Sequence, residues 1–312
     1  PAAGYSRGAA AAAVEQPQLL GHSGWVVSLE VSPDGSRLVS ADSWGRLTLR
    51  SMESADLPVL WSHAEAHAGW IRQAVFSSDG QRLASCGVDG MVRVWSAADG
   101  KLEQEFSGGG DDLYSLACHP DGETAVVGDL KGLIRRYRLR DGGCVQTFEA
   151  TDFYKLSYIQ DVGGVRTLAF SADGKVLAAG GCIPENGGFV QGIPGLRLFS
   201  TDDAQLLQAL RLGDNQEGFV HQVLEHPLGY WMGVCSGQPG KGQLFLHRQG
   251  DETPFCVHRE SLSNCHSLVL HPAGRELAVA ANAGTYGQQK SMAREGNYPG
   301  NTSPIHVLEL PA

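Results

Sequence analysis

The stretch "SSDGQRLASCGVDGMVRVWS", residues 77–96, holds two glycine turns that join segments of alternating apolar residues. Such a pair of segments around a turn predicts a β-hairpin, because Asp and Gly adopt the dihedrals that reverse the chain. The first turn recurs as "SPDG" (32–35), "HPDG" (119–122), "SADG" (171–174), "HPLG" (226–229) and "HPAG" (271–274). The final glycines lie 45, 42, 52, 55 and 45 residues apart, a period that predicts stacked repeats.

Each repeat contains three strand-like segments and a weaker fourth. In the second unit "WIRQAVF" precedes the turn, "QRLASC" follows it and "MVRVW" comes third, and the third segment recurs as "RLTLR", "LIRRY", "GLRLF", "QLFLH" and "PIHVLEL". We therefore expect an all-β fold, a single β-propeller of four-stranded antiparallel blades. Six blades are expected and seven are the alternative, with a worn blade within 145–163 or residues before Pro1 supplying the seventh.

From about Leu19 onward, the chain resembles the WD-repeat β-propeller family. "GHSGWV" (21–26) and "AHAGWI" (66–71) resemble the Gly-His opening of that repeat, and "VRVWS" (92–96) resembles its Trp-Asp closing with Ser96 replacing Asp. In the second unit the resemblance implies a structural hydrogen-bond set: His67, Ser85, Asp89 and Trp95. We expect these residues to be scaffold groups and not a catalytic triad, because a Ser, a His and an Asp have clear structural roles in the repeat.

The other units depart from this set. The first unit keeps His22 and Ser40. Other residues hold the positions of Asp89 and Trp95: Trp44 and Arg50 in the first unit, Lys131 and Tyr137 in the third, and Phe199, His247 and Leu308 at the end of the last three third strands. The departures at Trp44 and Lys131 are positions where we look for function.

Ring closure is expected to involve the N-terminal region. "EQPQLL" at 15–20 occupies the place that a fourth strand takes before other units. If residues 16–20 complete the last blade, both ends of the chain lie in one sheet and no edge stays open. We expect 16–312 to form the propeller and 1–15 to be a flexible small-residue segment; the remnant of a cleaved secretory signal is the alternative.

Composition excludes several classes of function. The formal charge of −10 and the absence of a basic stripe argue against a nucleic-acid partner. No apolar run reaches the roughly 20 residues that span a bilayer, so we expect a soluble chain and leave cytoplasmic and exported locations open. Seven scattered cysteines without a C-x-x-C pair indicate neither a disulfide framework nor a zinc site. We expect no cofactor, no metal and no catalytic residue.

One end of the ring carries all the long loops. Loops that enter the innermost strand and loops between the second and third strands share this end, because neighbouring strands are antiparallel. The long insertions fall in these two classes: 149–164, 182–194 and 283–303. Long loops in a compact repeat are typically functional or disordered, and three of them on one face make it the face that we expect to bind a partner.

A polar band is expected on the same face. Alignment of the innermost strands on their turns places six residues at one equivalent position: Val27, Arg72, Tyr114, Arg166, His221 and His266. The last five, here named the polar ring, could receive a carboxylate, a phosphate or an acidic peptide, or could pair locally between blades. Five aromatic residues are also expected there: Trp25, Trp70, Trp44, Tyr286 and Tyr298. Aromatic residues and Arg dominate interface energetics.

Three functions remain open from the sequence. The first is a non-enzymatic scaffold that binds a protein or peptide partner through the loop-rich face. The second is a small-ligand-binding or enzymatic propeller that uses the polar ring, with His221 and His266 as acid/base groups or metal ligands. The third is a structural subunit of a larger assembly.

Overall fold

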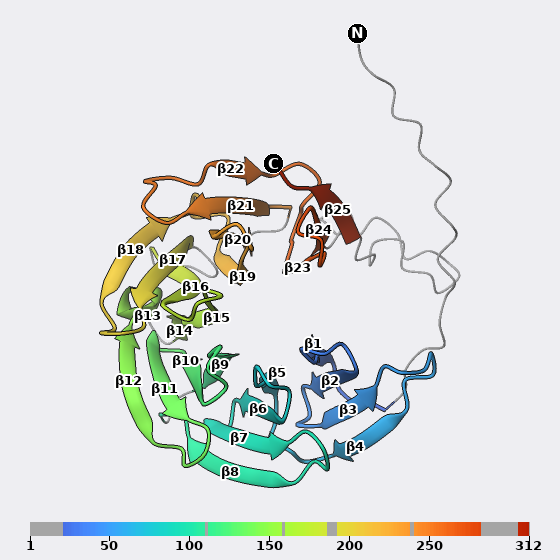
Figure 1. Cartoon of the computed structure of the whole chain (residues 1–312). Coiled ribbons are helices and arrows are strands. Elements are labelled where there is room, and N and C mark those ends of the chain that lie inside the picture. The colour runs from blue at the N-terminus through green and yellow to red at the C-terminus, as the bar shows by residue number, and fades with distance from the viewer. Residues whose placement is uncertain are drawn as a thin grey trace, which may run out of the picture.

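Six antiparallel sheets are arranged around a central axis in the computed structural model (Figure 1). The structure describes residues 21–109, 112–157, 160–185, 192–237, 240–281 and 305–311. Within these ranges five of these sheets have four strands and the sixth has three, and a separate two-stranded sheet is inserted between two of them. The expected all-β, six-bladed propeller is therefore confirmed.

The first three blades follow one another along the chain. Blade 1 comprises β1 (Val26–Val31), β2 (Arg37–Asp42), β3 (Leu47–Ser51) and β4 (Val59–His63). Blade 2 comprises β5 (Ile71–Phe76), β6 (Arg82–Gly87), β7 (Met91–Ser96) and β8 (Leu102–Ser107). Blade 3 comprises β9 (Leu113–Cys118), β10 (Thr124–Asp129), β11 (Leu133–Arg138) and β12 (Cys144–Glu149).

An insertion precedes the last three blades. It consists of the 3-10 helix η1 (Thr151–Phe153) and the hairpin β13 (Tyr154–Ser157) and β14 (Gln160–Gly163). Blade 4 comprises β15 (Val165–Phe170), β16 (Val176–Pro184), β17 (Gly192–Ser200) and β18 (Leu206–Arg211). Blade 5 comprises β19 (Phe219–Glu225), β20 (Tyr230–Ser236), β21 (Gln243–Arg248) and β22 (Cys256–His258), and blade 6 comprises β23 (Ser267–Leu270), β24 (Glu276–Ala280) and β25 (Ile305–Glu309).

Two expectations about extra strands have different outcomes. The alternative of a worn blade within 145–163 is wrong, because β12 is the outer strand of blade 3 and β13 pairs only with β14 in a two-stranded sheet. The closing strand expected at 16–20 lies outside the described residues, as does the segment 1–15.

The repeated turns explain why the hairpins recur. The last glycine of each of the six turns has a positive φ, between 66° and 79°, which L-residues rarely adopt. In the turns that contain Asp34, Asp79 and Asp173, the carboxylate accepts hydrogen bonds from a Ser hydroxyl and from a backbone N–H two residues later. These hydrogen bonds lower the pKa of each carboxyl group and fix the turn.

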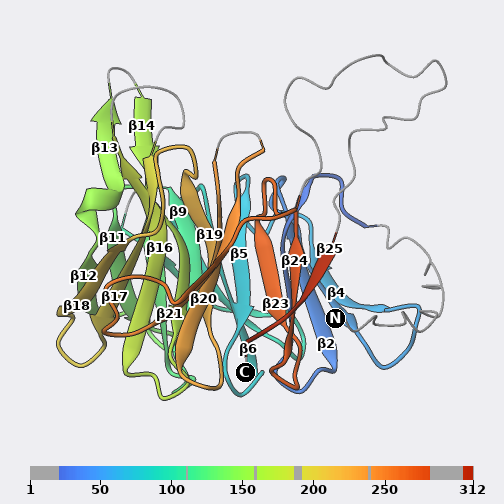
Figure 2. The same ribbon diagram turned by 90° about the horizontal axis from the view of Figure 1, so that it is seen from above.

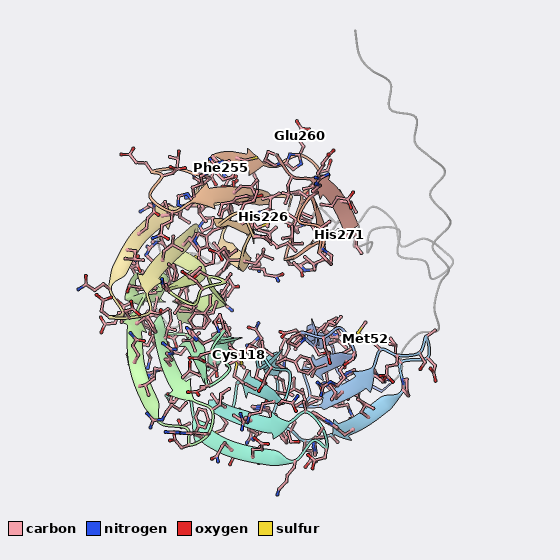
Figure 3. The ribbon with its side chains drawn as sticks, in the orientation of Figure 1. Met52, Cys118, His226, Phe255, Glu260 and His271 are labelled. Atoms are coloured by element: carbon pink, nitrogen blue, oxygen red, sulfur yellow. The ribbon has the colours of Figure 1, made fainter. Side chains whose placement is uncertain are left out.

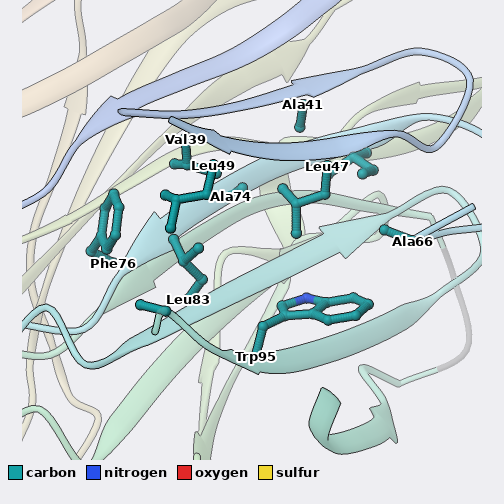
Figure 4. Close-up of a cluster of buried hydrophobic side chains, with 11 residues drawn as sticks. Val39, Ala41, Leu47, Leu49, Ala66, Ala74, Phe76, Leu83 and Trp95 are labelled. Carbon is teal, nitrogen blue, oxygen red and sulfur yellow. The ribbon is translucent and has the colours of Figure 1, made fainter. Parts of the chain in front are cut away.

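The hydrophobic core lies between blades. Five clusters of buried side chains join blades 1 and 2, 2 and 3, 3 and 4, 4 and 5, and 5 and 6. Between blades 1 and 2, Val39 and Leu49 pack with Leu83 and Trp95 (Figure 4). Blades 2 to 5 therefore each use one face of the sheet for the preceding blade and the other face for the following one.

Candidate functional site

The hydrogen-bond set of blade 2 is continuous and buried. His67 bonds Asp89 through Nδ1 at 2.9 Å and Ser85 through Nε2 at 2.8 Å. The indole N–H of Trp95 donates to the Ser85 oxygen at 2.9 Å. Burial would raise the pKa of Asp89, but hydrogen bonds from His67 and Arg93 outweigh it and hold that pKa well below its usual range. Ser85 is wholly buried, and its hydroxyl oxygen is hydrogen-bonded to both His67 and Trp95. The geometry is therefore that of a scaffold.

Blades 1 and 3 keep a carboxylate that the sequence comparison misplaced. His22 Nδ1 lies 2.9 Å from Asp42, which is two residues before Trp44, and His22 Nε2 lies 2.7 Å from Ser40. The interpretation of Trp44 as the residue that replaces the blade 1 carboxylate is therefore wrong. A carboxylate at the end of the second strand reaches the same histidine as one in the following turn. In blade 3 the equivalent Asp129 pairs with Arg135 at 2.8 Å.

Four of the five polar-ring residues, and Val27 of blade 1, occupy β-bulges. The pairing of the innermost strand with the second strand skips one residue in each of the first five blades: Val27, Arg72, Tyr114, Arg166 and His221. A bulge re-aims the side chain of its extra residue. The alignment on the turns therefore selected one structural position, and the β13–β14 hairpin extends from the same end of the ring (Figure 2).

Aromatic and cationic side chains alternate along the ring. The Arg72 guanidinium lies over the rings of Trp70 and Tyr114, at 5.0 and 4.8 Å from their centroids. The Arg166 guanidinium lies over Tyr114 at 4.0 Å and over Phe219 at 4.9 Å. Stacking between aromatic faces holds both guanidinium groups in place.

These two arginines lack a carboxylate partner within the described residues. Neither forms an ion pair there, and the buried Nε atom of each has no hydrogen-bond acceptor. Burial and the nearby Arg72 lower the pKa of Arg166, although Tyr114 opposes this effect. A desolvated cation without a counter-ion is costly, so this part of the ring favours an anionic ligand.

The two histidines of the polar ring differ in their surroundings. Burial, with smaller contributions from Arg166 and His266, lowers the pKa of His221 to about 4, although a hydrogen bond with the Ser236 carbonyl opposes this shift. His266 lies just before β23 and is exposed. Across the described ranges, no group of three or more His, Cys, Asp or Glu residues could hold a metal ion.

Exposed aromatics flank the ring on blade 1. Trp25 packs edge to face on Trp70, with ring centroids 5.8 Å apart, and remains largely exposed. Trp44 is also exposed, and its backbone N–H donates to Asp42. Tyr286 and Tyr298 lie outside the described residues. Of the expected aromatics, Trp25, Trp70 and Trp44 are thus placed at the end of the ring that carries the polar residues.

The insertion before blade 4 is anchored at its base. Phe153 is buried in the cluster between blades 3 and 4, and Arg197 stacks on Phe153 and pairs with Asp152. Further out, the Lys155 ammonium donates to the Glu185 carbonyl at 3.2 Å. The hairpin therefore stands on a fixed base beside the polar ring.

Sequence reasoning missed a set of polar residues that join the blades. Each follows the ring position directly: Ser28, Gln73, Ser115, Thr167, Gln222 and Ser267. Four accept a hydrogen bond from a backbone N–H of the next blade, at Ala74, Leu116, Val223 and Leu268. Ser115 instead donates to the Val165 carbonyl. The recurring polar residue in an apolar strand was the available clue.

Comparison with known proteins agrees with this architecture. The family model "WD domain, G-beta repeat" matches residues 15–49 and 60–96. The chain is 29% identical to Telomerase protein component 1 of Rattus norvegicus over 195 residues, which is 61% of this chain and 6% of that protein. It is 25% identical to WD repeat-containing protein 90 of Mus musculus over 156 residues, 50% of this chain and 8% of that protein.

The chain therefore spans less than a tenth of the length of each relative. No helix within the described ranges is long and apolar enough to cross a membrane. The six sheets, the blade 2 hydrogen-bond set and the matched repeats all agree. The first two blades contain repeats that match the WD-repeat family, and the six-bladed propeller as a whole is similar to that family.

Proposed function

We propose that this propeller is a protein-interaction module that binds an acidic peptide segment of a partner at the polar ring. The observation that supports this proposal is the pair Arg72 and Arg166, two stacked guanidinium groups that lack a carboxylate partner in the described part of the chain. Arginine presents a planar fork of donors that matches a carboxylate.

The surroundings of the two arginines favour a peptide over a small anion. Trp25 and Trp44 are exposed beside the ring on blade 1, and the β13–β14 hairpin stands next to it on the side of blade 4. A peptide that places an acidic side chain between the arginines would also bury an apolar side chain on these indoles. Exposed aromatics near a charged anchor are typical of interface hot spots.

The similarity to WD-repeat proteins supports a role in protein interaction. WD-repeat propellers generally act as protein-interaction scaffolds and are typically non-enzymatic. The net charge of −10 does not favour acidic ligands at long range, so recognition would depend on the local field of the ring. The relative named as a telomerase component supports a place within a larger complex, without identifying the partner.

Peptide binding tests the proposal. Fluorescence anisotropy would compare a labelled glutamate-rich peptide with a glutamine-rich peptide of the same length. We expect Arg72→Met and Arg166→Met each to weaken binding of the acidic peptide at least tenfold, or about 1.4 kcal/mol. Arg140→Met is the control, because Arg140 is exposed at the β11–β12 turn. Equal affinity in all four proteins would contradict the proposal.

A further inference from the structure

We propose that the polar ring selects an extended acidic segment in which two glutamate or aspartate side chains stand two residues apart. This specificity rests on the acidic-peptide function proposed above and narrows it to one pattern of residues. Two features of the ring carry it: the positions of Arg72 and Arg166 on either side of Tyr114, and an acceptor atom of His221.

Arg72, Tyr114 and Arg166 lie on the innermost strands of three consecutive blades. They belong to β5, β9 and β15. The innermost strands border the centre of the ring, and Figure 3 shows Cys118, the last residue of β9, at the inner margin of blade 3. Tyr114 is on the same strand as Cys118. Its ring therefore lies between an arginine of the preceding blade and an arginine of the following one.

The Tyr114 ring limits the distance between the two guanidinium groups. The central carbon of the Arg72 guanidinium lies 4.8 Å from the ring centroid, and that of Arg166 lies 4.0 Å from it. The two carbons therefore cannot be farther apart than these two distances combined. Because Arg72 also lies over Trp70 and Arg166 over Phe219, each group contacts two aromatic rings, which hold it at this separation.

An extended peptide matches this separation with side chains two residues apart. Successive side chains of a strand point to opposite faces, and those at i and i+2 lie on one face, about 7 Å apart. Side chains at i and i+4 lie about 13 Å apart, which exceeds the separation of the two arginines. Adjacent acidic residues would point one carboxylate away from the ring. The alternating pattern therefore lets each guanidinium pair with its own carboxylate.

The charge at the site favours two anionic groups over one. Neither Arg72 nor Arg166 forms an ion pair with a carboxylate of the described residues. Burial and the nearby Arg72 charge lower the pKa of Arg166, although Tyr114 opposes this effect. A single carboxylate would leave one desolvated positive charge without a counter-ion, whereas two carboxylates balance the pair.

His221 favours an extended peptide over a helical one. It lies next to Phe219, over which Arg166 stacks. Its Nε2 donates to the Ser236 carbonyl at 3.1 Å, and burial lowers its pKa to about 4, so the ring is neutral near pH 7. Nδ1 can therefore only accept, and it accepts no hydrogen bond within the described ranges. An extended peptide offers free backbone N–H groups to such an acceptor, whereas a helix uses its own internally.

Isomeric peptides test the pattern without any change to the protein. Three labelled peptides of identical composition would carry two Glu residues in an alanine–serine background, at i and i+1, i and i+2, or i and i+4. A fourth peptide would have Gln at both positions of the i, i+2 peptide. Fluorescence anisotropy with the 312-residue chain gives the four affinities. We expect the i, i+2 peptide to bind at least about tenfold more tightly than either isomer, and the Gln peptide to bind most weakly.

Double-mutant cycles then assign the two carboxylates. In the parent protein, we expect replacement of either Glu of the i, i+2 peptide by Gln to weaken binding at least about fivefold. In Arg72→Met one of these replacements should cost less than about twofold, and in Arg166→Met the other should. Arg140→Met is the control and should behave as the parent, because Arg140 is exposed at the β11–β12 turn. Melting temperatures establish that each variant is folded.

The outcomes separate this specificity from the acidic-peptide function. Equal affinity of the three Glu isomers, all above that of the Gln peptide, would overturn the alternating pattern and leave acidic-peptide binding in place. Tightest binding of the i, i+4 peptide would indicate a helical ligand and would also overturn the pattern. Glu peptides that bind no better than the Gln peptide would contradict both proposals.

Discussion

Two polar regions of this propeller, the blade 2 hydrogen-bond set and the polar ring, differ in how well their polar atoms are satisfied. In blade 2, each polar side chain of the set His67, Ser85 and Asp89 has a partner of opposite hydrogen-bonding character within 3 Å. At the polar ring, Arg72 and Arg166 are held by aromatic rings, but their Nε atoms lack an acceptor among the described residues. Satisfied networks stabilise a fold, whereas an unsatisfied cation costs stability that a ligand can recover.

The largest expected effect concerns the satisfied network. Asp89→Ala removes the carboxylate partner of His67 and one of the two carboxylates that pair with Arg93, which keeps Glu105. We expect the free energy of unfolding, measured by urea titration, to fall by about 3 kcal/mol or more. Asp202→Ala is the control because Asp202 is exposed. Equal stability of the two variants would show that the network contributes little.

An intermediate effect concerns the histidine of the polar ring. The pKa of His221 is lowered from 6.5 to about 4 in the folded protein. The unfolded chain therefore binds a proton first as pH falls, so stability is lost between about pH 6.5 and 4. His221→Gln is expected to reduce this loss. Arg166 and His266 are the charged or titratable groups that act on His221, so the variant His266→Gln serves for comparison; an unchanged pH profile in His221→Gln would contradict the assignment.

The smallest expected effect is on stability at the unsatisfied site. Arg166→Met removes cation–π contacts worth about 1–2 kcal/mol but also removes a desolvated charge. We expect thermal and urea unfolding to give a stability within about 1 kcal/mol of the parent. A loss as large as that of Asp89→Ala would mean that Arg166 is a scaffold residue and would remove the contrast between the two regions.

The fold could be predicted from the sequence because every blade contains the same glycine turn between its first and second strands. Each turn needs a glycine with positive φ, so the glycines recur with the period of the blade and mark the register of every inner strand. Alignment on those turns also selected the bulge position of Arg72 and Arg166, because turn and bulge are separated by one strand of constant length.

Other features depend on distances that a linear alignment does not contain. Asp42 and a residue in the place of Trp44 are two positions apart in sequence, yet a carboxylate at either position can reach the same histidine. The two-stranded form of the β13–β14 insertion and the alternation of Arg72 and Arg166 with aromatic rings required the three-dimensional arrangement.

The central claim is that Arg166 serves recognition of a carboxylate and not the fold. A double-mutant cycle tests it most directly, by measuring the affinity of the parent and of Arg166→Met for a peptide with a single Glu and for the same peptide with Gln. We expect the substitution to cost at least about tenfold with the Glu peptide and less than about twofold with the Gln peptide, at unchanged melting temperature. Equal losses with both peptides, or no loss with either, would contradict the claim.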